Sequence, residues 1–442
     1  MVSSNPPPTL LPTPAADLDA ATVREMLRRA GGQHYPRWAA RVRATGYCLH
    51  PIHLQRRHGV VAADRLSMRC GNRRAAVCIS CSRLYAGDTW QLVHAGILGG
   101  HHNIPDTVTQ HPQVFLTLTA PSFGAVYPTA HRTHAGQPRR PDTYDYRGHV
   151  LFTWWAPSLW QRFTMRLRRL LAAQLKALGL AKDAVRLSFL KVHENQTRLI
   201  PHYHAVVRLD HPDTTGKQCG AIDFPVSSSD LAALAAEAVR SIVLPVPDTS
   251  MPDGVRELRF GPQIDARPLD ASIPERQRRK IAGYLAKYVT KSVTDAGISP
   301  RPISPAAIDD PTIAVQVSRH VLQIWHTLRD LADQQPDEYA AMVRWLHTLG
   351  YRGHVTTKSR HYSTTLGHLR QIRAVWRQQH GTADNADGHG DNQGESDCEP
   401  WEFAGAGHFT HGDYQLTLAA AHRHMEQLWA RREHAWPAGG PP

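Results

Sequence analysis

Two histidines and a glutamate near the middle of the chain have the residue types of a divalent-metal site. His202 and His204 flank Tyr203 in an apolar run. Alternate residues of a β-strand project to the same face, so the two imidazoles would lie side by side. Glu194, on the other arm of a predicted hairpin, could add a carboxylate, and such a set suits a cation that polarises a phosphate oxygen. In a chain with 28 histidines, a single His-x-His is nevertheless more often structural.

Two tyrosines four residues apart offer a nucleophile for phosphodiester chemistry. Tyr284 and Tyr288 lie in a predicted helix over residues 281–292, where this spacing places both phenols on one face. A phenol is a suitable covalent nucleophile because its aryloxide is a good leaving group, so the reaction that forms the phosphate ester can run in reverse. Lys287 and Lys291 could favour the phenolate or hold a flanking phosphate. Core packing of the two rings is the structural alternative.

A cysteine cluster near the N-terminus indicates a second metal site. Cys70, Cys78 and Cys81 contain a Cys-x2-Cys knuckle, and Cys48 precedes them. These four thiols could close a tetrahedral structural zinc site that helps a basic module grip duplex DNA. The alternatives are His50 or His53 as the fourth ligand, or reduced thiols without metal. The six cysteines of this chain are too few for a disulfide scaffold, and Cys219 and Cys398 have no partners in the sequence.

The charge balance favours a polyanionic partner. Among the 442 residues, 51 Lys and Arg face 38 Asp and Glu, for a net charge of +13. The mean hydropathy is −0.41, and we expect a cytoplasmic protein without a membrane partner, because neither a long apolar run nor a secretory signal pattern is present. Although any one basic segment could be a solvated face, we expect DNA binding, weakened by salt, from these residues: Arg276, Arg278, Arg279, Lys280, Lys291, Lys358 and Arg360.

The pattern of apolar residues predicts the elements that position these groups. We expect a strand over 114–119, a hairpin over 185–210, and helices over 17–29, 227–243, 281–292 and 414–435, together with one that follows Pro157 and is stopped by Gly179. The predicted divisions are a disordered N-terminus (1–16), a zinc-binding module (17–109), a nicking domain (110–295), a basic helical DNA-binding region (296–380), a disordered acidic linker (381–400) and a C-terminal helix with its tail (401–442).

Three segments in one order carry a family resemblance. FLTLTAPSFG, HENQTRLIPHYHAVVRLD and YLAKYVTKS resemble the three motifs of rolling-circle replication initiators. The stretch from Cys48 to Arg377, with its cysteine cluster and the segments RFGPQIDARPL and GYRGHVTTKSRHYSTTLGHLR, resembles the initiators of actinobacterial, Streptomyces-type plasmids. The resemblance implies an α+β protein of the HUH endonuclease superfamily. A palm-like antiparallel sheet would carry the histidine pair on a central strand beside a tyrosine-bearing helix, with a zinc module and a helical C-terminal region added.

The resemblance also implies an activity. Such initiators nick one strand of plasmid origin DNA through a 5′-phosphotyrosine, and the free 3′-hydroxyl primes rolling-circle synthesis. The partners would be duplex and single-stranded origin DNA, with host helicase and polymerase as further candidates.

The motifs assign roles to particular residues. His202 and His204 match the metal-binding pair, Glu194 is the expected third ligand, Mg²⁺ or Mn²⁺ the expected ion, and Tyr288 matches the nicking tyrosine. Tyr284 stands where some plasmid initiators have a glutamate, which leaves open whether a second tyrosine or an activated water completes the cycle.

Three further questions stay open at the level of sequence. Thr117 and Thr119 of the first motif are either structural or contact the DNA backbone. A paired-tyrosine HUH transposase is a rival enzyme, which would require transposon-end DNA. A non-catalytic, zinc-dependent DNA-binding regulator is a rival of another class, which would bind DNA without forming a covalent adduct.

Overall fold

The computed structural model describes residues 18–56, 65–131, 133–212, 224–290, 298–299, 301–380 and 401–435. The chain divides into two compact units, a smaller one of Met1–Ala86 with Arg370–Pro442 and a larger one of Gly87–Leu369. The predicted disordered segments 1–16 and 381–400, together with Lys291, Cys219 and Cys398, lie outside the described residues. Among the described residues, no helix is both long and apolar enough to cross a membrane.

The larger unit is built on a five-stranded antiparallel sheet in the order β8-β3-β5-β4-β9. The central hairpin confirms the predicted one, and Glu194 stands opposite His202 in its register. The strand predicted at 114–119 is also present. The five strands are β3 (Gln113–Leu118), β4 (Arg186–Asn195), β5 (Pro201–Asp210), β8 (Ile264–Pro268) and β9 (Thr356–Lys358). The pairing therefore places the histidine pair on the middle strand.

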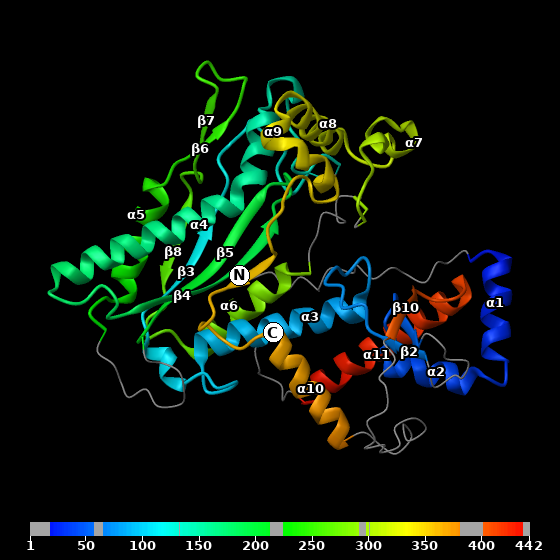
Figure 1. The fold of residues 1–442 in the computed structure, drawn as a ribbon. Helices are drawn as coiled ribbons and strands as arrows, with labels where there is room; N and C mark the ends of the chain where they lie inside the picture. The colour runs from blue at the N-terminus through cyan, green and yellow to red at the C-terminus, as the bar shows by residue number, and fades with distance from the viewer. Residues whose placement is uncertain are drawn as a thin grey trace. The chain divides into compact units, whose positions relative to one another are not determined.

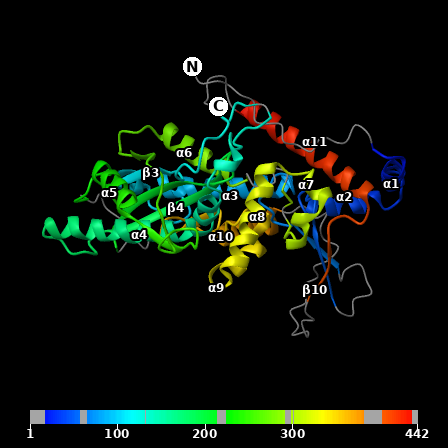
Figure 2. The same ribbon diagram turned by 90° about the horizontal axis from the view of Figure 1, so that it is seen from above.

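Helices cover both faces of this sheet. The long helix α4 (Tyr146–Ala177) packs with α5 (Ser228–Ser241) on one face, while α6 (Glu275–Tyr288) lies on the other (Figures 1 and 2). The alternation of β5 explains the division, because Tyr203 points into the core, where its ring is 5.8 Å from that of Trp160 of α4. His202 and His204 project to the opposite face, toward α6.

Two helices begin earlier than the sequence predicts. Helix α4 starts at Tyr146 and runs through Pro157, which was expected to precede it. Its first turns bury Val150, Leu151 and Phe152, and this burial offsets the roughly 3 kcal/mol cost of an internal proline. Helix α6 starts at Glu275 and ends at Tyr288, so the basic run that was expected to precede it forms its first turns.

The remainder of the larger unit contradicts a separate basic region at 296–380. Strand β9 pairs with β4, and α8 (Arg319–Gln334) buries Val321, Ile324 and Trp325 in the same core as the sheet. A shared core makes these segments one unit. The other described elements are β6 (Leu244–Pro247), β7 (Val255–Leu258), α7 (Pro311–Ala314), α9 (Pro336–Tyr339) and the 3-10 helices Asp106–Gln110, Pro141–Thr143, Pro305–Asp309 and Ala340–Thr348.

The smaller unit joins the two ends of the chain, which the sequence assigned to separate regions. Strand β10 pairs with β1 in a three-stranded sheet of order β10-β1-β2, and Arg29 of α1 binds Asp413 of α11 at 2.6 Å. Its elements are α1 (Ala20–Ala30), α2 (Tyr35–Ala44), β1 (Ile52–Arg56), β2 (Arg65–Met68), β10 (Trp401–Ala406) and α11 (His411–Ala435). Helices α3 (Ile79–Leu98) and α10 (Leu366–His380) cross the division between the units.

Candidate active site and cysteine cluster

The histidine pair and the predicted carboxylate meet on one face of the central hairpin. The rings of His202 and His204 are 4.5 Å apart between centroids. Glu194 Oε2 lies 3.4 Å from Nε2 of His204, and both side chains are largely buried. Burial, followed by the neighbouring His204, lowers the pKa of His202 to about 4, so this imidazole is neutral at pH 7.

Strand β3, the residue that follows it and the hairpin turn contact the Nδ1 edge of the imidazoles. Thr117 Oγ1 lies 3.2 Å from Nδ1 of His204, and Thr119 Oγ1 lies 3.3 Å from Nδ1 of His202. The side-chain amide of Gln196 also approaches Nδ1 of His202, at 3.3 Å. Arg198 orients that amide by donating to its oxygen at 3.0 Å. The threonines of the first motif therefore have partners in the site itself.

Both tyrosines of α6 reach the same site. The Tyr284 hydroxyl is 3.4 Å from Nε2 of His204, and the ring of Tyr288 stacks on that imidazole at 5.2 Å between centroids. The two phenol rings are 4.7 Å apart, as their spacing on one helix face predicts. Tyr284 is 41% exposed, whereas Tyr288 is half-buried. Of the two, Tyr284 has the more open path to a substrate.

The protonation of Tyr288 differs from the expectation for a lysine-activated phenol. Burial, a hydrogen bond with Tyr284 and the charge of Glu194 all raise the pKa of Tyr288 above its usual value. Lys287 is exposed and does not offset these effects. A role of Lys287 in favouring the phenolate or in holding a flanking phosphate stays a prediction. A cation bound near Glu194 would counter the charge of that carboxylate and so lower the pKa of Tyr288.

A cavity of about 690 Å³ lies between the sheet and α6. Its walls include both histidines and Tyr284, which opens the site to a substrate. On the side of β8 and α6, polar and cationic groups line it: Gln263, Asp265, Arg267, Gln277 and Lys280. Sequence reasoning gave no role to the β8 residues, although RFGPQIDARPL belongs to the resemblance. Their alternate spacing on a strand was the available signal.

The basic residues that the sequence assigned to DNA have different environments. Arg278 is 2% exposed and donates to the carbonyls of Thr109, Leu269 and Asp270 at 2.6–3.2 Å, so its prediction as a DNA contact is wrong. Helical periodicity explains this, because Arg278 shares the buried face with Ala282 and Leu285.

Lys358 also has a structural environment. It is half-buried, and its ammonium donates to three carbonyls, of which Ser363 O is 2.9 Å away. Arg279 is exposed and pairs with Glu275 at 2.7 Å. Arg276, Lys280 and Arg360 have exposed side chains, so DNA can reach them and their predicted contact with DNA stays a prediction. Lys280 also lines the cavity.

The donor atoms of His204 and Glu194 fit a divalent cation. Their 3.4 Å separation suits two ligands on one ion, and imidazole with carboxylate is a donor set that Mn²⁺ accepts. His202 stands further out: among the described residues, the four cysteines are the group whose potential ligand atoms all lie within 4.8 Å of one another. For one ion to be held by all three, His202 would have to move closer to His204 and Glu194.

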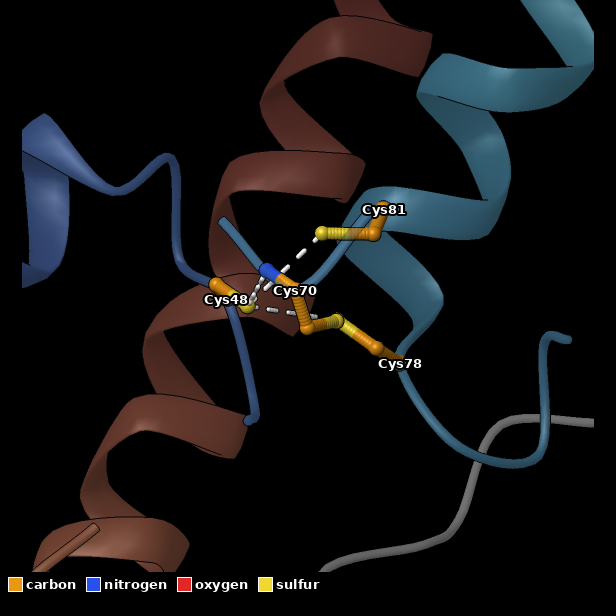
Figure 3. Close-up of side chains that lie close together, drawn as sticks. All are labelled: Cys48, Cys70, Cys78 and Cys81. Atoms are coloured by element: carbon orange, nitrogen blue, oxygen red, sulfur yellow. Dashed lines mark hydrogen bonds between the residues drawn. The ribbon is translucent and has the colours of Figure 1, made fainter. Parts of the chain in front are cut away.

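The cysteine cluster of the smaller unit has the geometry of a tetrahedral metal site (Figure 3). The Cys48 sulfur lies 3.9 Å from that of Cys78 and 3.7 Å from that of Cys81. Ligands 2.3 Å from a tetrahedral zinc ion would be about 3.8 Å apart. Backbone N–H groups of Cys70 and Leu49 point at the sulfurs of Cys48 and Cys78, at 3.3 Å each, as thiolate ligands require.

The structure distinguishes between the candidates for the fourth ligand. Both ring nitrogens of His53 are engaged elsewhere, with Ser67 Oγ and Gly407 O at 2.8 Å each. His50 packs its ring toward Tyr414 instead, at 6.0 Å between centroids. Cys48 lies in the group with Cys70, Cys78 and Cys81. The four-cysteine set is the one that the geometry favours.

Comparison with known proteins identifies the class. The sequence model of the family described as RepSA, replication initiator protein, pSAM2, matches residues 34–135 and 128–422. The chain therefore belongs to this family of replication initiator proteins. It is similar to a replication initiator protein of Streptomyces ambofaciens, with 37% identity over 445 aligned positions that cover 91% of this chain and 94% of the relative. No solved structure matches the chain.

Proposed function

We propose that this protein starts rolling-circle replication of a plasmid by nicking one strand of origin DNA with Tyr288. The observation that carries the proposal is the clustering of His202, Glu194 and both tyrosines around His204, beside a cavity whose walls include the two histidines and Tyr284. A central β5 strand bearing the histidines beside a tyrosine helix is what an HUH endonuclease requires, and we assign the larger unit to that palm-like fold.

The nicking step exchanges one phosphate ester for another. The Tyr288 oxygen bonds to phosphorus, and the bond from phosphorus to the 3′-oxygen of the preceding nucleotide breaks. The phenol proton passes to solvent, the leaving oxygen takes a proton to become the 3′-hydroxyl, and the 5′-phosphate stays on tyrosine. Because the phosphotyrosine conserves the ester, the reverse reaction rejoins the strand.

The residues around the phosphate have separate roles in this proposal. Mg²⁺ or Mn²⁺ at His202, His204 and Glu194 would polarise a phosphate oxygen when bound. Lys280 and Arg267, which line the cavity, attract the flanking phosphates. The Tyr284 hydroxyl lies 3.4 Å from Nε2 of His204, and Tyr284 serves as a second nucleophile when the cycle ends.

The proposed substrate is single-stranded DNA exposed at the origin, and the smaller unit is assigned to duplex binding. The cavity, with a volume of about 690 Å³, is lined by amide and cationic groups, which suit bases and phosphates. In the smaller unit, a zinc ion on the four cysteines would fix helices that carry Arg24, Arg28 and Arg37.

A covalent-adduct assay tests the proposal. Labelled single-stranded origin oligonucleotide is incubated with the protein and Mn²⁺, and denaturing gels compare wild type with Tyr288→Phe and Tyr284→Phe. We expect an adduct from the wild type, none from Tyr288→Phe, and one from Tyr284→Phe, because the first nick uses Tyr288. The removed hydroxyl is the sole change in each variant, so the two form a matched pair.

The other outcomes are equally informative. An adduct lost only in Tyr284→Phe moves the nucleophile one helical turn toward the cavity opening. Site-specific origin binding without an adduct from any form of the protein supports a regulator instead of a nicking enzyme. Cleavage that requires transposon ends supports the transposase.

A further inference from the structure

We propose that Thr117 is a positioning residue: its hydroxyl holds a proton on Nδ1 of His204 and so keeps Nε2 of that imidazole available to a divalent cation. The inference rests on the proposed function, because it takes His204 as a cation ligand. It assigns a specific chemical role to a residue of the first motif, for which the sequence offered only a structural role or a DNA contact.

The sheet register brings the two side chains together. Thr117 and His204 are direct partners across β3 and β5, so both side chains project from the same face. The Thr117 oxygen is 3.2 Å from Nδ1 of His204. Phe115, two residues earlier on β3, lies parallel to the imidazole at 6.1 Å, and Tyr288 stacks on it at 5.2 Å. These rings flank the imidazole, whose Nδ1 faces the Thr117 hydroxyl.

The opposite edge of the ring faces the catalytic groups. Nε2 of His204 lies 3.4 Å from Glu194 Oε2 and 3.4 Å from the Tyr284 hydroxyl. A neutral imidazole carries one proton, on either nitrogen. A carboxylate beside Nε2 attracts that proton, and a protonated Nε2 cannot bind a cation. An acceptor at Nδ1 is needed to counter this pull, and the Thr117 hydroxyl is placed to be that acceptor.

Thr119 does not act on His202 in the same way. The Gln196 amide reaches Nδ1 of His202 at 3.3 Å, and Arg198 holds the amide oxygen, which leaves the NH₂ group as the donor. A donor at Nδ1 favours the tautomer with the proton on Nε2. The Gln196 amide therefore competes with the Thr119 hydroxyl for Nδ1 of His202. The inference is therefore limited to Thr117 and His204.

Two measurements on the full-length protein test this role, and neither measures nicking. Two-bond ¹H–¹⁵N correlation spectra of the metal-free protein report which nitrogen of His204 carries a proton, and Mn²⁺ titrations followed by electron paramagnetic resonance report cation affinity. We expect Nδ1 to be protonated in the wild type. Thr117→Val, which keeps the shape and removes the hydroxyl, should move the proton to Nε2 and weaken Mn²⁺ binding by about tenfold or more.

Two further variants separate this role from general packing. Thr117→Ser restores a hydroxyl and should keep both the Nδ1 proton and wild-type Mn²⁺ affinity. Thr164→Val is the matched control: its buried hydroxyl, on α4, donates to Gln161 O at 2.9 Å, and its loss should change neither measurement.

The inference is overturned if Nδ1 of His204 carries no proton in the wild type. This measurement needs no variant. It is also overturned if Thr117→Val binds Mn²⁺ as tightly as the wild type. Failure of the proposed function is a separate result. A wild type that never forms the tyrosine adduct, but whose Thr117→Val variant shifts the tautomer and loses Mn²⁺ affinity, keeps the role of Thr117 and removes the nicking activity.

Discussion

At the residue scale, charge in the sequence does not define a DNA contact. Arg276, Arg278 and Arg279 lie within one helical turn of α6, yet Arg276 and Arg279 are exposed, whereas Arg278 is buried. A guanidinium has five donors, and burial is tolerated when backbone carbonyls accept from them. The three carbonyls that Arg278 contacts belong to the segments before β3 and after β8, so the side chain ties α6 to the edge of the sheet.

This difference in burial predicts that two neighbouring substitutions affect different properties, one the stability and the other the DNA binding. Arg278→Ala should lower the free energy of unfolding by about 2–3 kcal/mol, because it removes a buried charged donor from its carbonyl partners. Arg276→Ala should change that free energy by less than about 0.5 kcal/mol and should weaken binding of single-stranded DNA. Urea unfolding and oligonucleotide titration measure the two quantities. An Arg278→Ala protein of wild-type stability with weakened DNA binding would contradict the structural role.

At the scale of elements, helix α8 is connected to the β4–β5 turn through a buried histidine. His320 Nε2 donates to the carbonyl of Arg198 at 3.1 Å, while Nδ1 accepts from the Tyr146 hydroxyl at 3.2 Å. Arg198 in turn binds the carbonyls of Ala120 and Pro121 after β3. These bonds connect α8, α4 and the end of β3 to the turn that carries Gln196 beside His202.

The connection should make the protein less stable in mild acid. Burial lowers the pKa of His320 to about 4, below the value of about 6.5 for an unfolded histidine. Between these values the unfolded chain binds the proton and the folded one does not, so the free energy of unfolding falls as the pH drops from 7 to 4. The contribution of one histidine is at most about 1.4 kcal/mol per pH unit.

A glutamine at this position isolates the effect. His320→Gln should be less stable than the wild type at pH 7, because it fits the two hydrogen bonds less well. The difference between the two proteins should shrink toward pH 5, because glutamine does not titrate. Thermal melting of both proteins at pH 5, 6 and 7 gives the comparison, and a difference that stays constant with pH would show that His320 does not contribute.

At the scale of the whole molecule, the two units divide the proposed chemistry. The histidines, Glu194 and both tyrosines belong to the larger unit, whereas the four cysteines belong to the smaller one. The smaller unit has a small apolar core around the cysteines, to which α11 contributes Leu418, Ala421 and Met425. A core of this size would gain much of its stability from a bound metal ion.

Removal of zinc should therefore affect one unit and spare the other. We expect the purified protein to contain about one zinc ion, and Cys78→Ser or a strong chelator to remove it and lower the melting temperature of the smaller unit. The same protein should still form the tyrosine adduct on a short single-stranded oligonucleotide and should lose affinity for duplex origin DNA. Cys219→Ser is the control, since the sequence offers that cysteine no ligand partner. Metal analysis showing no zinc in the wild type would contradict the assignment.

The sequence by itself determined the local features of the site. Strand alternation placed His202 and His204 on one face, helical spacing placed the two tyrosines together, and the hairpin set Glu194 opposite His202. Each of these depends on backbone periodicity over a few residues, which the order of residues fixes. The Cys-x2-Cys spacing indicated the cysteine cluster for the same reason.

Only the tertiary structure decided how distant segments combine. The pairing of β1 with β10, which joins the N-terminal module to the C-terminal segment, depends on long-range packing that local periodicity does not encode. The same holds for Thr117 beside His204, because a cross-strand partner is set by the register between strands far apart in sequence. The start of α4 before Pro157 and the burial of Arg278 also depend on what covers them. Local residues fix which groups can act, and packing decides which of them meet.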